Sequence, residues 1–413
     1  MDFDDTREEA AFRAEARGWL AAHAEPKRGA FETWQSRYHG REGWDGLERA
    51  KAFQAKKADA GFAALHWPVE WGGRALPPIY QVIYAQEESR YLVARGYFEI
   101  GLGMCMPTLF VYGTEEQKQR YAPRALRGDE VWCQLFSEPA AGSDLAGLRT
   151  RAMKDGDQWV VNGQKIWTSG AHWSDWAILV ARSDPKTVKP KGLTFFFLSM
   201  KSPGIETRRI RQISGASHFN EVYFTDVRIP DSQRLGPVGG GWGVAITTLM
   251  NERLTSGDLR GPDFEEIFEL ARHVPLEDGL AIESAAVRER LADIYVKTQG
   301  VRLTRFRTMT ALSRGETPGP ENSIGKLVNA PKAQEIASFA MDLLDVGGVI
   351  MDKDIAPVRA AFQESLLSSP GGRIAAGTDE ILRNIIAERV LGLPPDVRVD
   401  KDLPFRELPA GKR

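Results

Sequence analysis

The hydrophobic pattern of this 413-residue chain changes character twice, and these two changes limit its fold more than any other feature. Up to about Gly128, apolar residues recur at helical spacing among charged ones. From Trp132 to Pro230 the chain is rich in aromatic and β-branched residues separated by turn signals, which is typical of short strands. After the glycine-rich run 239–243 the helical period returns, so an α+β protein is predicted. We expect an N-terminal helical domain, a central β domain and a C-terminal helical bundle, over residues 1–130, 131–236 and 237–413.

Within the β-rich stretch, the pattern favours antiparallel pairing in a small sandwich or barrel. The Asn162-Gly163 pair lies between two strand-like segments, 159–161 and 164–167, and predicts a hairpin with a type I′ turn. Further strands are predicted at 177–181, 193–198 and 222–227.

Single residues predict two details of the helical parts. Thr114 is followed three residues later by Gln117, which indicates a capping box at the start of a helix. The stretch 314–322, with two prolines and two glycines, predicts a loop between helices. The N-terminus is acidic, so we expect neither a secretion signal nor a transit peptide.

Composition and charge exclude several classes of function. Lys and Arg total 54 against 56 Asp and Glu, so no basic excess points to nucleic acid. The longest dense apolar stretch, 193–200, is too short to cross a bilayer, and we expect no membrane partner. Cys105 and Cys133 form neither a disulfide framework nor a metal cluster. They are predicted to be buried thiols in a reducing cytoplasm.

The best-known cofactor and catalytic motifs are missing from the sequence. Gly101-Leu102-Gly103 lacks the third glycine of a dinucleotide-binding loop and falls in a helical region. There is no phosphate-binding P-loop, no Gly-x-Ser-x-Gly elbow and no His/Cys spacing for zinc. Any cofactor must therefore be held in another way.

Three segments carry the strongest functional signal. Residues 133–147 (CQLFSEPAAGSDLAG) gather small residues and hydroxyls around Pro and Gly, so backbone amides can approach a flat ligand or anionic oxygens closely. Residues 162–171 (NGQKIWTSGA), taken alone, indicate only a hairpin with a core Trp. Residues 376–389 (AGTDEILRNIIAER), taken alone, indicate only a capped amphipathic helix.

Together and in this order, the three segments resemble the acyl-CoA dehydrogenase family, over about residues 12–395. The Ser-Glu-Pro-x-Ala-Gly-Ser-Asp segment followed by Asn-Gly-x-Lys-x-Trp is highly specific for that family. The resemblance implies the family's fold, in which the C-terminal part is a four-helix bundle, and FAD as the cofactor. It further implies oxidation of an acyl-CoA thioester to the trans-2-enoyl-CoA. The expected enzyme of lipid catabolism is a cytoplasmic homotetramer or dimer that passes electrons to an electron-transferring flavoprotein.

The same resemblance assigns residues to the cofactor. Trp167 would cover one face of the flavin ring, and Ser169, where the family often has Thr, would hydrogen-bond near the flavin N5. The C-terminal bundle would hold the FAD of a neighbouring subunit. The implied cofactor-binding positions are Gln134, Phe136, Ser137, Trp167, Thr168, Ser169, Arg272, Gly347, Gly348, Thr378 and Glu380.

The implied reaction needs a carboxylate base beside the α-carbon of the substrate. Many family members carry this Glu at the position of Ala376, whereas the isovaleryl and long-chain branches carry it within Leu-x-x-Glu-Arg-Leu. This sequence matches the second pattern, so Glu252 is the predicted base, made more basic by burial. The resemblance also implies substrate contacts from Arg253, from Ser143, which would reach the pyrophosphate or the CoA, and from the backbone amide of Ala376.

Two alternatives stay open, and three departures from the family pattern favour the first of them. Pro275 stands where the family has Phe, Leu344 where it has Gln and Ile350 where it has Gly, all at contacts to the neighbour's FAD. The chain could therefore be a non-catalytic or half-catalytic subunit of a heterotetramer. A flavin monooxygenase or nitroalkane oxidase on the same fold is the other alternative, and Glu252 counts against both of these enzymes. Fatty, branched and steroid acyl groups all remain compatible with the sequence.

Overall fold

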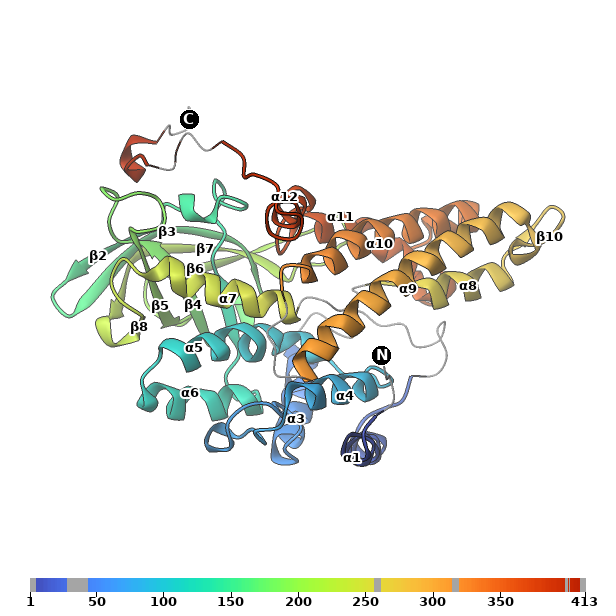
Figure 1. Ribbon diagram of the computed structural model, residues 1–413, viewed down its shortest axis with the longest axis horizontal. Helices are drawn as coiled ribbons and strands as arrows, with labels where there is room; N and C mark the ends of the chain where they lie inside the picture. The colour runs from blue at the N-terminus through green and yellow to red at the C-terminus, as the bar shows by residue number, and fades with distance from the viewer. Residues whose placement is uncertain are drawn as a thin grey trace.

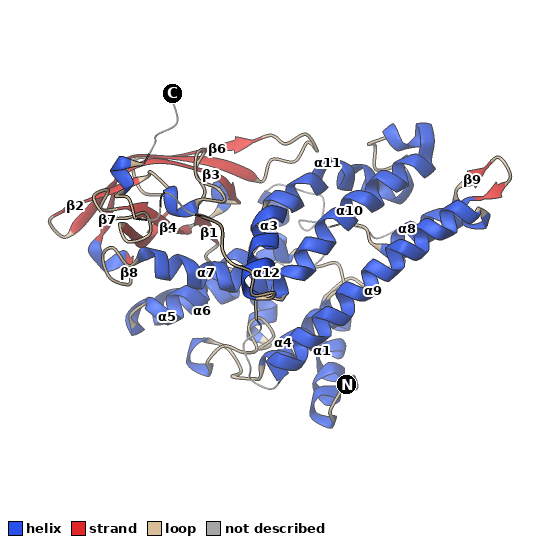
Figure 2. Cartoon of the chain, turned by 45° about the horizontal axis from the view of Figure 1, so that its top comes forward, coloured by secondary structure: helices blue, strands red, loops and turns tan. Residues whose placement is uncertain are grey.

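A computed structural model describes residues 5–27, 44–255, 261–313, 319–397, 400 and 402–408 of the chain. The N-terminal helices lie below the central sheet and below the long C-terminal helices, which extend away from the sheet (Figure 1). Figure 2 shows the same division between strands and helices from a second direction. The predicted α+β class is confirmed.

The helices before the sheet pack around several apolar clusters, one of which contains Phe12, Leu20 and Tyr84. A π-helical turn, Gly101–Cys105, leads directly into one of these helices. The capping box predicted at Thr114 is confirmed, because Thr114 and Gln117 each accept a hydrogen bond from the other's backbone amide. The α-helices of this part are α1 (Arg7–His23), α3 (Trp44–Asp59), α4 (Pro78–Glu88), α5 (Met106–Tyr112) and α6 (Glu115–Arg127).

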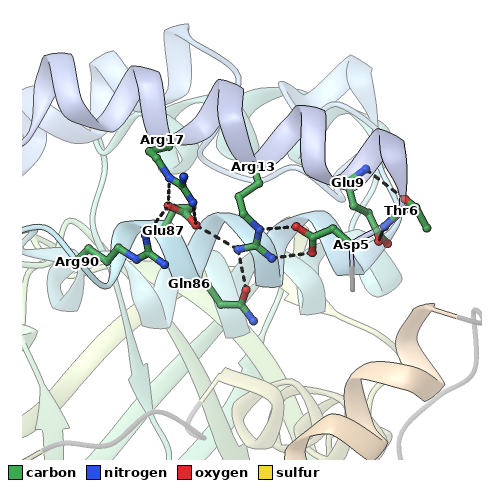
Figure 3. Close-up of polar contacts among 8 residues, drawn as sticks. All are labelled: Asp5, Thr6, Glu9, Arg13, Arg17, Gln86, Glu87 and Arg90. Atoms are coloured by element: carbon green, nitrogen blue, oxygen red, sulfur yellow. Dashed lines mark hydrogen bonds and ion pairs between the residues drawn. The ribbon is translucent and has the colours of Figure 1, made fainter. Parts of the chain in front are cut away.

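A cluster of arginines around one buried carboxylate joins α1 to α4 (Figure 3). Glu87 is fully buried and lies 3.2 Å from Arg13, 3.0 Å from Arg17 and 3.5 Å from Arg90. Burial alone would raise the pKa of Glu87, but hydrogen bonds from Arg17 and Arg13 outweigh that effect and hold it below its usual value. The carboxylate therefore stays charged and ties the first helix to the rest of the N-terminal part.

The central sheet is mostly antiparallel and runs in the order β6-β7-β3-β2-β4-β5-β8, with β1 paired to β4 in parallel. Phe195, Phe196 and Phe197 are all buried, because β5 is covered on both faces. The strands are β1 (Trp132–Leu135), β2 (Arg151–Asp155), β3 (Gln158–Ser169), β4 (Trp176–Arg182), β5 (Leu193–Ser199), β6 (Ile205–Ile210), β7 (Phe219–Pro230) and β8 (Arg234–Leu235).

The hairpin predicted at Asn162-Gly163 is wrong. The strand β3 runs straight through this pair, and the turn that joins β2 to β3 lies earlier, around Gly156. The Asn-Gly pair instead forms an irregularity in the pairing of β3 with β7, where the Asn162 amide donates to Asp226 at 2.9 Å. Gly163 is needed there because a Cβ would approach Thr150 Oγ1 to 2.6 Å.

The C-terminal helices share a core that includes Ile336, Ala340 and Phe362. Their bounds are α7 (Gly241–Thr255), α8 (Phe264–His273), α9 (Ala285–Ser313), α10 (Asn322–Leu344), α11 (Ala361–Ile374) and α12 (Asp379–Arg389), with a small hairpin of β9 (Pro275–Leu276) and β10 (Gly279–Leu280). Of the loop predicted at 314–322, residues 314–318 lie outside the described residues. None of the helices in the described ranges is both long and apolar enough to span a membrane.

Candidate functional site

The C-terminal end of β3 has an unusual backbone. Between Lys165 and Thr168 the pairing of β3 with β7 shifts register, and Trp167 adopts a left-handed φ of 60°. The shift leaves Trp167 55% exposed and buries Thr168, which is 1% exposed. In the described part of the chain, the hydroxyl oxygen of Thr168 has no hydrogen-bond partner. An exposed indole beside an unpaired buried hydroxyl suits a planar ligand that carries polar groups.

A buried ion pair fixes the loop that follows β1. The ammonium of Lys165 lies 2.9 Å from a carboxylate oxygen of Glu138, and both side chains are buried. Glu138 also accepts the backbone amides of Arg149 at 2.6 Å and Thr150 at 2.8 Å. Burial alone would raise the pKa of Glu138, but the charge of Lys165 and these hydrogen bonds outweigh it and lower the pKa. The segment from Glu138 to Thr150 is thereby closed into a loop.

This ion pair also brings together the predicted cofactor residues of the sheet. Lys165 donates a hydrogen bond of 2.9 Å to the carbonyl of Phe136, and the amide of Ile166 donates to the carbonyl of Ser137 at 2.9 Å. Gln134, at the end of β1, is half-buried, and Phe136 is buried. The structure therefore places the first and second sequence segments against each other, with Ser137 beside the end of β3.

Ser143 lies elsewhere on this loop and is exposed. Its neighbour Asp144 forms an ion pair of 2.7 Å with Lys189, which also lies 2.5 Å from Asp400 of the C-terminal tail. The loop that carries Ser143 is thus tied to the connection between β4 and β5 and to the C-terminal tail.

The third segment forms a tight turn between α11 and α12. Ala376 has a left-handed φ of 53°, and the hydroxyl of Thr378 caps α12 by accepting the amide of Ile381 at 3.2 Å. Lys326, from α10, donates a hydrogen bond to the carbonyl of Gly377. The exposed carboxylate of Glu380 has a lowered pKa, because it accepts from its own backbone amide and from Thr378. The turn therefore leads into the capped start of α12, where the carboxylate of Glu380 is exposed.

The predicted base lies near the end of α7. Glu252 is half-buried and interacts with neighbouring groups of the protein. The backbone of Arg253 continues the helix, and the placement of its side chain lies outside the described structure. The helix α7 is anchored to the N-terminal part, because Thr248 and Thr108 share a buried hydrogen bond of 2.8 Å. Glu252 therefore projects from a helix with a fixed position.

Three predicted cofactor residues lie far from the sheet. Arg272 occupies the last turn of α8, beside the β9–β10 hairpin, at the end of the molecule away from the sheet in both views (Figures 1 and 2). Gly347 and Gly348 follow α10. From Lys326, which contacts the turn at Gly377, to Leu344 this helix spans about 27 Å at 1.5 Å per residue. One chain therefore does not bring Gly347 and Gly348 to the turn at Gly377.

Sequence reasoning missed several buried polar residues that position the site. Asn220, on β7, bonds the backbone at the end of β3, and Arg182, on β4, bonds the carbonyls of Ala146 and Lys189 at 2.6 Å each. Burial lowers the pKa of Arg182 to about 10. The sequence did offer a signal for both residues, because each is polar at a strand position whose neighbours on the same face are apolar. Polar side chains at such positions are rarely buried without partners.

Comparison with known proteins agrees with this layout. The acyl-CoA dehydrogenase N-terminal, middle and C-terminal domain models match residues 6–129, 133–227 and 239–391. The acyl-CoA dehydrogenase IpdE1 of Mycobacterium tuberculosis is 36% identical over 392 residues, covering 94% of this chain and 98% of the relative. The acyl-CoA dehydrogenase FadE34 of the same organism is 38% identical over 343 residues, and the match spans 83% of this chain and only 46% of that relative's length.

A solved structure described as "Tcur3481-Tcur3483 steroid ACAD" superimposes with a TM-score of 0.80 at 28% identity, covering 96% of this chain and all of the other. The fold, the order of the three segments and these matches along nearly the whole chain agree. The chain belongs to the acyl-CoA dehydrogenase family and is an oxidoreductase of that class.

Proposed function

We propose that this chain binds FAD and oxidises the α,β carbon–carbon bond of an acyl-CoA thioester, giving the trans-2-enoyl-CoA. Members of this family depend on FAD and act on acyl-CoA thioesters, and the geometry at the end of β3 is the observation that supports the same role here. Trp167 offers an exposed ring beside the buried, unpaired hydroxyl of Thr168.

The residues of the first two segments fit the flavin end of FAD. Phe136 and Ser137 are held against β3 by the hydrogen bonds from Lys165 and Ile166, and Gln134 lies just before them on β1. Trp167 and Ser169 would then contact the ring, and Thr378 and Glu380 the adenosine half. When bound, FAD supplies the two-electron acceptor for the hydride that leaves the β-carbon.

The protein's own part in the reaction is to remove a proton and to hold the thioester. Glu252, which is half-buried near the end of α7, would take the α-proton as the general base. The amide of Ala376 would donate to the thioester carbonyl, which stabilises the negative charge that develops on that oxygen. Ser143 and Arg253 would hold the CoA portion.

The distant residues Arg272, Gly347 and Gly348 would complete the cofactor site of another subunit. Gly347 and Gly348 lie most of the length of α10 away from the turn at Gly377, which supports an oligomer, either of identical chains or with a second, related chain. The departures at Pro275, Leu344 and Ile350 favour a different partner chain at this contact. The similar solved structure is named for two proteins and as a steroid enzyme, so a steroid-derived acyl group joins the fatty acyl groups as a proposed substrate. The proposed electron acceptor is an electron-transferring flavoprotein.

Anaerobic titration of the purified protein with fatty, branched and steroid acyl-CoA thioesters tests this proposal. The expected result is loss of the flavin absorbance with one class of thioester. A yellow protein that no thioester bleaches contradicts dehydrogenation. A colourless protein that gains FAD and activity only when mixed with a second chain supports the half-catalytic alternative.

A further inference from the structure

The backbone at the end of β3 is not held by strand pairing alone. Asn220, on β7, is 0% exposed, and its side-chain nitrogen donates to the carbonyl of Thr168 at 2.9 Å and to that of His218 at 3.1 Å. The amide of Gly170 in turn donates to the carbonyl of His218 at 2.8 Å. One side-chain amide therefore bridges the two segments at the point where their register shifts.

The contacts of Asn220 also fix the orientation of its amide. Both carbonyls can only accept, so the nitrogen of the amide must face them. The amide oxygen of Asn220 then faces the ring of His172, whose Nδ1 lies 2.9 Å away. Because this oxygen can only accept, Nδ1 of His172 must carry a proton and donate it. The pair thus specifies the tautomer of His172 as well as the rotamer of Asn220.

The turn that follows β3 belongs to the same network. Ser174 donates its hydroxyl to the carbonyl of Gly170 at 2.9 Å. Gly170 has a φ of 70°, and a Cβ there would approach the indole nitrogen of Trp173 to 2.4 Å, so only glycine fits. His172 and Trp173 lie with ring centroids 4.2 Å apart. Residues 168–174 are therefore held by Asn220 from β7 and by contacts among their own side chains, none of which the proposed reaction uses.

We propose that Asn220 and His172 are positioning residues for the flavin, which set the backbone of residues 167–169 to receive the ring. This inference rests on the proposed function, because the ring is the ligand that these residues are proposed to meet. Trp167 has a left-handed backbone conformation, which is costly for a residue with a large side chain. The hydrogen bond from the Asn220 amide to the carbonyl of Thr168, the next residue, stabilises this conformation. Without these donors, the indole and the hydroxyls of Thr168 and Ser169 shift away from the ring.

The test compares Asn220→Asp with Asn162→Asp. Both substitutions keep the shape of the side chain and remove an amide donor between the same two strands, at Asn220 in the buried network and at Asn162 in the exposed bridge to Asp226. We expect Asn220→Asp to raise the dissociation constant for FAD at least about tenfold and to shift the absorption maxima of bound flavin. Asn162→Asp is expected to leave both unchanged. Hydrogen exchange of the amides in residues 168–170 of the FAD-free protein should be faster only in Asn220→Asp.

A second pair of variants protects the test against a failure of Asn220→Asp to fold. His172→Gln keeps a donor toward Asn220, whereas His172→Phe removes it. We expect His172→Phe to show the same change in FAD affinity, absorption and exchange, and His172→Gln to restore most of it. Equal FAD affinity, spectra and exchange in all folded variants overturn the positioning role. A wild-type protein that binds no FAD, even with a partner chain, overturns the proposed function itself, and the exchange measurement separates the two failures.

Discussion

The two ends of this molecule are stabilised in different ways. At the sheet end, residues 134–174 are tied together by buried side chains of the same chain, such as Lys165 with Glu138 and Asn220 with Thr168. At the far end of the C-terminal helices, Val346 and Val349 are 79% and 82% exposed, beside the predicted cofactor residues Gly347 and Gly348. An exposed apolar patch next to residues with a proposed binding role is typical of a surface that another chain covers. The sheet end is thus held together by contacts within one chain, whereas the far end leaves apolar side chains uncovered.

The largest expected effect lies at the sheet end. Lys165→Met leaves the buried carboxylate of Glu138 without its cation, and breaking a buried pair in this way costs about 3–5 kcal/mol. We expect a much lower free energy of unfolding in urea and loss of FAD. The control is Lys201→Met, which removes an exposed pair with Asp175 and should cost at most about 1 kcal/mol. Equal stability of the two variants would show that the sheet end does not depend on this pair.

The same pair predicts how stability depends on pH. The pKa of Glu138 is lower in the folded protein than in the unfolded chain, so its contribution to stability is fully present above about pH 4.5. That contribution is lost as the pH falls through the lowered folded value. We expect the free energy of unfolding to decrease with falling pH below 4.5, and less steeply in Glu138→Gln. Identical slopes for the two proteins would rule out a lowered pKa at this residue.

Substitutions at the far end should weaken the association of subunits and leave the stability of the single chain unchanged. Val346→Asp combined with Val349→Asp places charges in the exposed patch, and we expect a drop to a smaller species by light scattering with the melting temperature of the monomer unchanged. Assembly should weaken at least about tenfold, which corresponds to about 1.4 kcal/mol. Val397→Asp, at a residue that is 94% exposed on the C-terminal tail, is the matched control. An unchanged mass for the double variant would place the partner contact elsewhere.

The smallest expected effect concerns the tail that returns from the helices to the sheet. The ring of Phe405 lies 3.8 Å from the guanidinium of Arg182, and its amide donates to the carbonyl of Thr187 at 2.8 Å. A cation–π contact of this kind contributes about 0.5–2 kcal/mol. Phe405→Ala should lower the free energy of unfolding by about 1 kcal/mol, measured by urea denaturation, while Phe405→Trp should keep it. A larger loss in Phe405→Trp than in Phe405→Ala would exclude the cation–π contact.

The predictions from sequence were most accurate for features that depend only on residues close together in the chain. The capping box at Thr114 and Gln117 needs only four consecutive residues, and it forms as predicted. The hairpin at Asn162-Gly163 failed because pairing with β7, from more than 60 residues away, holds β3 straight through the turn signal. A distant strand therefore overrode a strong local preference.

The candidate site shows the same limit. The motifs indicated which residues matter, but strict alternation along β3 would place Trp167 on the same buried face as Lys165. The register shift between Lys165 and Thr168 reverses this and exposes the indole, and Asn220, across the sheet on β7, bonds the backbone at that shift. The separation of Gly347 from the turn at Gly377 likewise follows from the length and direction of α10 in space, which no motif contains.

The most direct test of the proposed function is the rate at which a bleaching acyl-CoA reduces the flavin anaerobically in Glu252→Gln and in the wild type. Glutamine keeps the size of the side chain and removes the base. We predict that FAD content and thioester binding are retained while the rate of flavin reduction falls about 10²–10⁴-fold. A variant that bleaches at the wild-type rate with its FAD in place would contradict the assignment of Glu252 as the base.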